Sequence, residues 1–149
     1  MKNLIGHCQV CARPIKVVRG LIARHGYYRI GRVENGKTCL GTRQPPLEVS
    51  FFETDITISA FEDLIAQIQK VLAQAQNGNA HPIEVSNSIN VRQKVKWEDA
   101  TEWDREKGQK LFIAGMMRDI ADLVKQVDML REAKKKYHGK GLIHEANIQ

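Results

Sequence analysis

Two parts of the sequence carry apolar residues at spacings that alternate between three and four, the pattern of a helix with one buried stripe. The stripes lie in residues 58–75 and 113–130. Their members are Ile58, Phe61, Ile65, Ile68, Leu72 and Ala75 in the first, and Ile113, Met116, Ile120, Leu123, Val127 and Leu130 in the second. Because a helix with a single apolar stripe must bury it, the two helices are expected to pack as an antiparallel hairpin, within one chain or completed by dimerisation.

Local signals indicate where these helices begin and end. Ser59 and Glu62 have the spacing of a capping box, and an Asn-Gly pair after the last apolar position is a typical stop, so the first helix is expected to have about nineteen residues. The second helix is expected over roughly 101–137, unless Gly108 or Gly115 marks a kink.

The first fifty residues differ from the rest in composition. They hold all three cysteines of the chain, several glycines and no helical periodicity, which favours a small β-rich module. Asn35-Gly36 separates two short segments of strand-forming residues, and both residues of such a pair tolerate the positive φ of a tight turn. A β-hairpin is therefore expected to turn at this pair.

The cysteines and one histidine of this module have the spacing of a metal site, Cys8-x2-Cys11-x13-His25-x13-Cys39. A Cys-x-x-Cys pair can present two thiolates to one ion from a tight turn, and zinc takes four such ligands in a tetrahedron. Three cysteines and a histidine leave no position for water, so the expected Zn²⁺ site is structural and stabilises a module too small for a large core. The alternatives are His7 as the fourth ligand and redox chemistry at the Cys-x-x-Cys pair, although the pair lacks a βαβ context.

Four short motifs in the first fifty residues carry a resemblance to a known group of proteins. They are Cys8-x-x-Cys11, Arg24-His25-Gly26-Tyr27, Cys39-x-Gly41 and Pro45-Pro46-x-Glu48-Val49-Ser50. The sequence resembles a group of small uncharacterised zinc-finger-like proteins encoded by bacteriophages and prophages, with Leu47 where an aromatic residue is expected. The resemblance implies zinc, a mobile-element origin and, by position, His25 and Cys39 as partners of the first two cysteines. It implies no biochemical activity.

Basic residues are concentrated in the same module. Residues 1–50 hold nine Lys or Arg and two Asp or Glu, in a chain of net charge +6. Such a surface, with tyrosines for base stacking, favours single-stranded or irregular nucleic acid as the partner, although the same charges also suit a solvated surface. The residues expected to bind nucleic acid are Arg24, Tyr28, Arg29 and Arg32 in the module and Arg92, Lys94 and Lys96 further along the chain.

The sequence holds no complete catalytic motif, and the protein is therefore interpreted as non-enzymatic. Acidic residues near the start of the second helix are expected to complement the helix dipole, the alternative being a metal-dependent nuclease. These residues are Asp99, Glu102, Asp104 and Glu106. Because no signal peptide or membrane-spanning stretch is recognisable, a cytoplasmic location in a host bacterial cell and no membrane partner are expected.

Together these patterns predict an α+β protein, with a zinc-stabilised β-module at 1–52 followed by an antiparallel helical hairpin at 53–149. The second part includes an extended connector at about 79–97 and a basic C-terminal tail. The expected function is that of a phage or mobile-element protein that binds nucleic acid or a host nucleoprotein through the zinc module, with a homodimer through the hairpin as one arrangement. The alternative is a phage-encoded inhibitor or adaptor that acts on a host complex such as a CRISPR or other defence effector.

Overall fold

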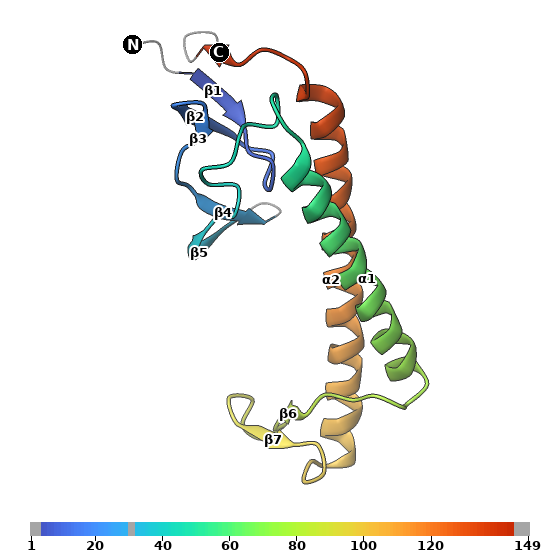
Figure 1. Cartoon of the computed structure of the whole chain (residues 1–149). Coiled ribbons are helices and arrows are strands. Elements are labelled where there is room, and N and C mark those ends of the chain that lie inside the picture. The colour runs from blue at the N-terminus through green and yellow to red at the C-terminus, as the bar shows by residue number, and fades with distance from the viewer. Residues whose placement is uncertain (1–3, 30–31, 145–149) are drawn as a thin grey trace. The chain divides into compact units, whose positions relative to one another are not determined.

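The computed structural model describes residues 4–29 and 32–144, and for residues 28, 29 and 32–35 it describes the backbone alone. Five strands come first: β1 (Leu4–His7), β2 (Pro14–Val18), β3 (Leu21–Ile22), β4 (Gly26–Arg29) and β5 (Arg32–Thr38). They are followed by α1 (Phe52–Gln76), β6 (Glu84–Ser86), β7 (Lys94–Lys96), α2 (Glu102–Tyr137) and β8 (Ile143–His144). The expected α+β class is confirmed, because N-terminal strands precede two long helices that form a hairpin (Figure 1).

The chain divides into two compact units. Unit 1 consists of Met1–Glu62 and Val124–Gln149, and unit 2 consists of Asp63–Leu123. Both helices therefore contribute residues to both units, whereas the division drawn from the sequence separates the β-module from the hairpin at residue 52.

Unit 1 contains a four-stranded antiparallel sheet in the order β3-β2-β1-β8. The pair Arg19-Gly20 joins β2 to β3, and its φ angles of 53° and 81° are those of a tight two-residue turn. β8 follows α2 in the chain and pairs with β1, where Leu4 lies opposite His144. The C-terminal segment thus completes the sheet of the N-terminal module, which the sequence pattern did not predict.

β4 and β5 form a second antiparallel pair in unit 1. The expected turn at Asn35-Gly36 is wrong, because these residues lie inside β5. The register of the pair shifts between Gly26 and Tyr28, which leaves extra residues on β5. The φ of 79° at Gly36 fits this irregularity, since glycine adopts positive φ without steric cost.

α1 begins at Phe52, well before the expected capping box at Ser59. That capping box is wrong, since Ser59 lies inside a helix of 25 residues. Contacts from the loop after β1 hold the first turn: the Glu53 amide donates to Gln9 Oε1 at 2.9 Å, and the Thr54 hydroxyl donates to the Gln9 carbonyl at 2.8 Å. These partners are distant in sequence, so a local pattern could not place the start of the helix.

α2 is a helix of 36 residues that neither Gly108 nor Gly115 interrupts. Thr101 caps its start, because the Thr101 hydroxyl accepts the Asp104 amide at 3.2 Å and donates to Asp104 Oδ2 at 2.9 Å. The most buried members of the two apolar stripes are Ile58, Ala75, Met116, Leu123, Val127 and Leu130. In the described ranges, neither helix is long and apolar enough to cross a membrane.

Gly108 is a packing glycine in unit 2. β6 and β7 form an antiparallel pair in which Val85 lies opposite Val95. Val85 is 2% exposed and lies so close to Gly108 that a Cβ on residue 108 would overlap the Val85 side chain. The absence of a side chain at this position therefore lets the β6–β7 hairpin pack against α2.

Replacing Gly108 by alanine is expected to destabilise unit 2 by about 1–3 kcal/mol, because the overlap with Val85 outweighs the gain of about 1 kcal/mol that alanine brings to a helix interior. Gly115→Ala is the matched control: apart from the adjacent backbone of the helix itself, no atom lies within 4 Å of a Cβ built there, so stability should rise by up to about 1 kcal/mol. Thermal unfolding followed by circular dichroism measures both changes. A melting temperature for Gly108→Ala at or above that of the wild type would contradict the close packing.

Candidate metal centre

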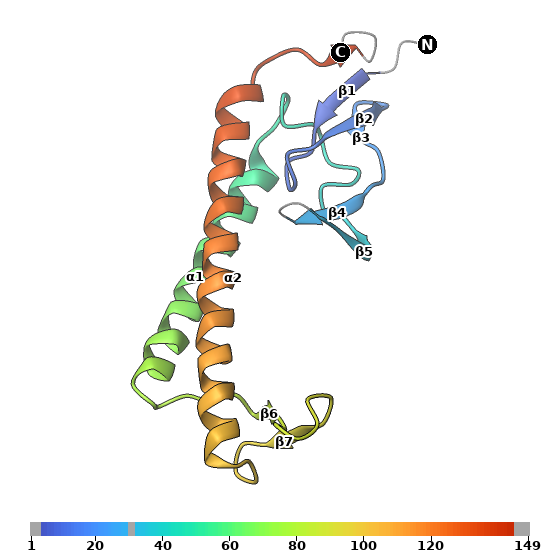
Figure 2. The same ribbon diagram turned by 180° about the vertical axis from the view of Figure 1, so that it is seen from behind.

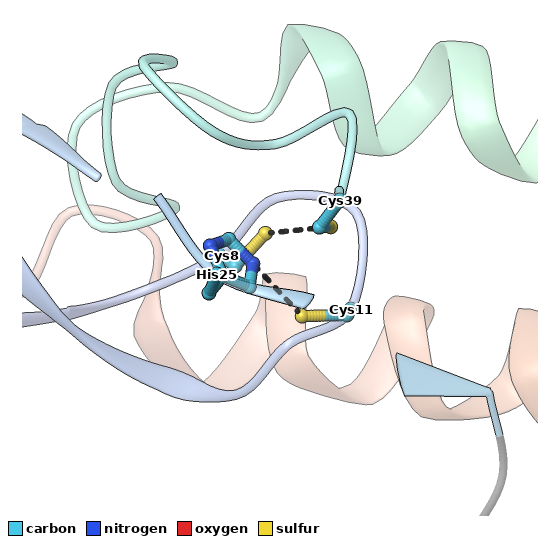
Figure 3. A group of neighbouring side chains, drawn as sticks. All are labelled: Cys8, Cys11, His25 and Cys39. Carbon is cyan, nitrogen blue, oxygen red and sulfur yellow. Dashed lines mark hydrogen bonds between the residues drawn. The ribbon is translucent and has the colours of Figure 1, made fainter. Parts of the chain in front are cut away.

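Four side chains from three segments of unit 1 come together in Figure 3. Cys8 and Cys11 lie in the loop between β1 and β2, His25 immediately precedes β4, and Cys39 immediately follows β5. Their ligand atoms all lie within 4.8 Å of one another. The residues that the spacing singled out therefore form a group that could hold a metal ion, and zinc is typical for three cysteines and one histidine.

Backbone hydrogen bonds close the loop that carries the first two cysteines. The Ala12 amide donates to the Cys8 carbonyl at 2.8 Å, and the Cys8 amide donates to the Arg13 carbonyl at 3.0 Å. Ala12 has a φ of 57°, in the left-handed region that reverses a chain tightly. The two thiols are thus brought together by the backbone of a short turn.

Each of the three sulfurs receives a backbone amide from the residue two positions further along. The Val10 amide donates to Cys8 Sγ at 3.4 Å. The Arg13 amide donates to the Cys11 sulfur, and the Gly41 amide donates to the Cys39 sulfur. Because an N–H donor favours a thiolate over a thiol, this arrangement prepares all three sulfurs as metal ligands.

Gly41 has a second role, because its backbone passes directly beside a candidate ligand. A Cβ at this position would overlap Cys8 Sγ. A larger residue would therefore displace the sulfur, and only glycine fits without a shift. The Cys39-x-Gly41 spacing was the available sequence signal for this residue.

His25 is oriented by a backbone carbonyl. Its Nδ1 lies 2.9 Å from the Ala23 oxygen, so the proton is assigned to Nδ1 as the donor. Its Nε2 lies 3.5 Å from Cys11 Sγ and carries the lone pair. Histidines that bind metals typically donate their second ring N–H in this way, so the orientation of His25 is that of a ligand.

His7, the alternative fourth ligand, has other partners. Its Nδ1 lies 2.6 Å from Glu48 Oε1, and its amide donates to the same carboxylate at 2.9 and 3.2 Å. The His7 ring stacks on Tyr137 with the ring centroids 3.5 Å apart. Burial alone would raise the pKa of the Glu48 carboxyl, but the hydrogen bonds from His7 hold this pKa below its ordinary value. These contacts attach β1 to the C-terminal end of α2, a role that the sequence did not reveal.

The three thiols interact too strongly to ionise together in the absence of a cation. Hydrogen bonds from the Cys39 and Cys8 thiols lower the pKa of Cys11. The hydrogen bond with Cys11 raises the pKa of Cys8, and it raises the pKa of Cys39 to about 11. One thiolate is therefore favoured while its neighbours resist ionisation. A divalent cation among them would stabilise all three thiolates, so the donor set fits a metal ion.

The candidate ligands also belong to the apolar core of unit 1. The buried members of this core are Cys8, Val10, Cys11, Val17, Ile22 and Cys39. All three cysteines are almost completely shielded from solvent. The three thiols of the candidate metal centre are therefore shielded from solvent by the surrounding protein.

The residues expected to bind nucleic acid are distributed over both units. Arg24 is exposed next to His25 in unit 1. Three others have side chains outside the described part of the structure: Tyr28, Arg29 and Arg32. The last three are exposed on or beside β7 in unit 2: Arg92, Lys94 and Lys96.

Two of the acidic residues considered for a second metal site, Asp104 and Glu106, have other contacts. Asp104 is buried and takes part in the cap with Thr101. Glu106 binds Lys110 at 2.7 Å, and this hydrogen bond lowers the pKa of the Glu106 carboxyl. Both contacts fit the interpretation of these residues as helix-start residues.

No family model matches the chain, and neither a curated protein nor a solved structure matches it. The resemblance to the phage zinc-finger-like group therefore stays a prediction.

Proposed function

We propose that the three cysteines and His25 bind one zinc ion. The sulfurs of Cys8 and Cys39 lie 3.7 Å apart, and Cys11 Sγ lies 3.5 Å from His25 Nε2. A tetrahedron with Zn–S bonds of about 2.3 Å and Zn–N bonds of about 2.0 Å has S–S edges of about 3.8 Å and S–N edges of about 3.5 Å. The agreement of the two separations with these edges is the observation that carries the assignment.

The zinc is structural rather than catalytic in this proposal. Four protein ligands fill a tetrahedron and leave no position for a water molecule or a substrate. The burial of the cysteines supports the same conclusion. Zinc would then contribute to folding of the module, and the protein would be non-enzymatic.

We further propose that this module belongs to a phage or mobile-element protein and binds nucleic acid or a nucleoprotein. The basic residues of the module with exposed side chains in the described part of the chain include Lys16, Arg19, Arg24 and Arg43. Of the two acidic residues in 1–50, Glu48 is buried against His7 and does not offset them at the surface. The exposed charge is therefore strongly positive, as binding to a polyanion requires.

The test is binding of labelled single-stranded and double-stranded DNA and RNA to the zinc-loaded protein over a range of salt concentrations. Affinity should fall with salt, because each phosphate contact releases about one counterion. Changing Lys16, Arg19, Arg24 and Arg43 together to glutamate should lower affinity at least about tenfold. The matched control reverses four exposed charges elsewhere: Lys70, Lys107, Arg118 and Lys125. Absence of nucleic-acid binding, or equal loss in both variants, would contradict the proposal.

A protein-directed inhibitor or adaptor is the second candidate, and a groove in unit 1 favours it. The groove has a volume of about 480 Å³ and lies between the β-module and the first turns of α1. Its apolar lining includes Leu40, Ile56 and Phe61. Leu40 is 81% exposed beside this lining, so a partner that filled the groove would bury it.

Capture of host proteins from a nuclease-treated bacterial lysate separates the two candidates. If the groove binds a protein, Leu40→Asp should lose a complex that the quadruple charge reversal retains. A complex that depends on nucleic acid and is indifferent to Leu40 would support the nucleic-acid proposal instead.

A further inference from the structure

The end of the β6–β7 hairpin exposes aliphatic side chains to solvent. Ile89 is 95% exposed and Val91 is 66% exposed. Both lie in the loop between the two strands, at residues 87–93. Because neither side chain packs against the rest of unit 2, their role is not in the stability of the fold.

Hydrogen bonds give this loop a defined shape without using the exposed side chains. Asn87 Oδ1 accepts the Ile89 amide at 2.8 Å, and the Asn87 amide donates to the Gln93 carbonyl at 3.0 Å. The Gln93 amide donates to the Asn90 carbonyl at 2.8 Å, and Asn90 Oδ1 accepts the Arg92 amide at 3.3 Å. The aliphatic side chains are therefore presented on an ordered turn, so little conformational entropy is lost on binding.

The base of the hairpin is attached to α2 within unit 2. Val85 packs against Gly108, and the Trp97 amide donates to the Ile83 carbonyl at 3.0 Å. The Arg105 side chain donates to the Trp97 carbonyl at 2.8 Å. Figures 1 and 2 both show β6 and β7 beside the first turns of α2. The hairpin is thus a supported projection.

Cations follow directly after the aliphatic residues. Arg92, Lys94 and Lys96 are all exposed. Lys94 and Lys96 alternate with the half-buried Val95, so both lie on the face of the ribbon that points away from α2. Glu84 lies opposite Lys96 across the hairpin, so the net positive charge is greatest near the tip, at Arg92 and Lys94. Cations beside an aliphatic tip are complementary to a ligand that combines phosphates with an apolar interior.

We propose that the β6–β7 hairpin enters the minor groove of double-stranded DNA, with Ile89 wedged against a base step and Arg92, Lys94 and Lys96 on the flanking phosphates. Proteins that bind the minor groove use aliphatic wedges of this kind, which unstack a base step and bend the duplex. This inference rests on the proposed binding of nucleic acid and names duplex DNA as a ligand. A lipid surface is the less suitable ligand, because residues 84–96 contain no aromatic side chain and anchoring in a bilayer interface relies on Trp, Phe or Leu.

The test uses the full-length zinc-loaded protein and a short DNA duplex labelled at both ends, so that affinity and bending are read from the same sample. Ile89→Ala should lower affinity about tenfold and remove the bend while leaving the salt dependence unchanged. Ile83→Ala is the matched control, because Ile83 is also an exposed isoleucine, 85%, but lies at the base of the hairpin. It should bind and bend DNA like the wild type.

A second variant tests the cations. Changing Arg92, Lys94 and Lys96 to glutamate should lower affinity at least about thirtyfold and reduce the slope of log affinity against log salt by about 2.7. The control reverses three other exposed charges of unit 2: Lys70, Lys107 and Arg118. Melting curves that match the wild type show that each variant is folded.

The outcomes distinguish this inference from the proposed function. If both hairpin variants bind and bend duplex DNA like their controls, while charge reversal in unit 1 abolishes binding, the hairpin inference fails and the proposed function stands. If the wild type binds no nucleic acid, both fail. If the hairpin variants lose binding to vesicles of phosphatidylserine and phosphatidylcholine but not to DNA, the hairpin is a lipid-binding element and the inference is overturned.

Discussion

Replacing Cys39 by serine is expected to abolish tight metal binding and to unfold the β-module of unit 1. The Cys39 sulfur lies 3.7 Å from Cys8 Sγ, and both cysteines are buried in the core that the metal centre completes. Structural zinc sites contribute on the order of 10 kcal/mol to folding, so losing one ligand removes more than a small module can replace. The wild type should therefore bind one zinc per chain, and Cys39→Ser should retain almost none.

The loss of helix in this variant should be confined to one part of the molecule. Unit 1 includes the first turns of α1, where Glu53 and Thr54 are held by Gln9 from the metal-binding loop. Those turns should fray when the module unfolds, whereas the helical residues of unit 2 should keep their signal in circular dichroism.

Zinc content by mass spectrometry and the absorption of a cobalt-substituted sample measure the site directly. Cobalt bound by three thiolates and one imidazole in a tetrahedron gives intense visible bands, which the variant should lack. Leu40→Ser is the matched control, because Leu40 is adjacent to Cys39 and its side chain is exposed. Full zinc retention and normal melting in Cys39→Ser would contradict the assignment.

The candidate metal ligands were predictable from the sequence because their spacing is a pattern in the sequence itself. A Cys-x-x-Cys pair in a tight turn defines half of a zinc site by itself. The sequence also favours His25 over His7 as the fourth candidate ligand, and the fold supports this choice, because His7 contacts Glu48 whereas His25 Nδ1 contacts the Ala23 carbonyl. The contact of His7 with Glu48 depends on where the chain returns in space, whereas Ala23 is only two residues from His25.

The helical hairpin was predictable because its two stripes repeat over several turns. The start of α1 was not, because Gln9 supplies partners for the first turn from a distant loop. β8 was missed for the same reason: a strand of two residues has no periodic pattern, and its pairing with β1 decides its conformation. Local signals also misplaced the turn at Asn35-Gly36, where the pairing of β4 with β5 outweighs the turn preference.

Replacing Glu48 by alanine is expected to destabilise unit 1 by about 3 kcal/mol, an effect second only to the loss of a metal ligand. The Glu48 carboxylate accepts hydrogen bonds from the ring and the amide of His7, and both side chains are almost fully buried. Without the carboxylate, these donors lose their partner in a region that water does not reach. The stack of His7 on Tyr137 and the junction between β1 and the end of α2 should loosen as a result.

The pH dependence of Glu48→Gln gives a sharper measurement, because glutamine keeps the size of the side chain and removes its charge. The folded-state pKa of Glu48 lies below its ordinary value of 4.5, so the carboxylate contributes stability above that pH and loses the contribution as pH falls through the folded-state pKa. The stability difference between wild type and Glu48→Gln should therefore be greatest near neutral pH and should shrink below about pH 4.5. Taking the difference cancels the release of metal by acid, which both proteins share. Glu132→Gln, at an exposed glutamate, is the control and should change stability by less than about 1 kcal/mol. A gap between wild type and Glu48→Gln that widened on acidification would mean that the carboxylate is not stabilised by His7 in the folded state.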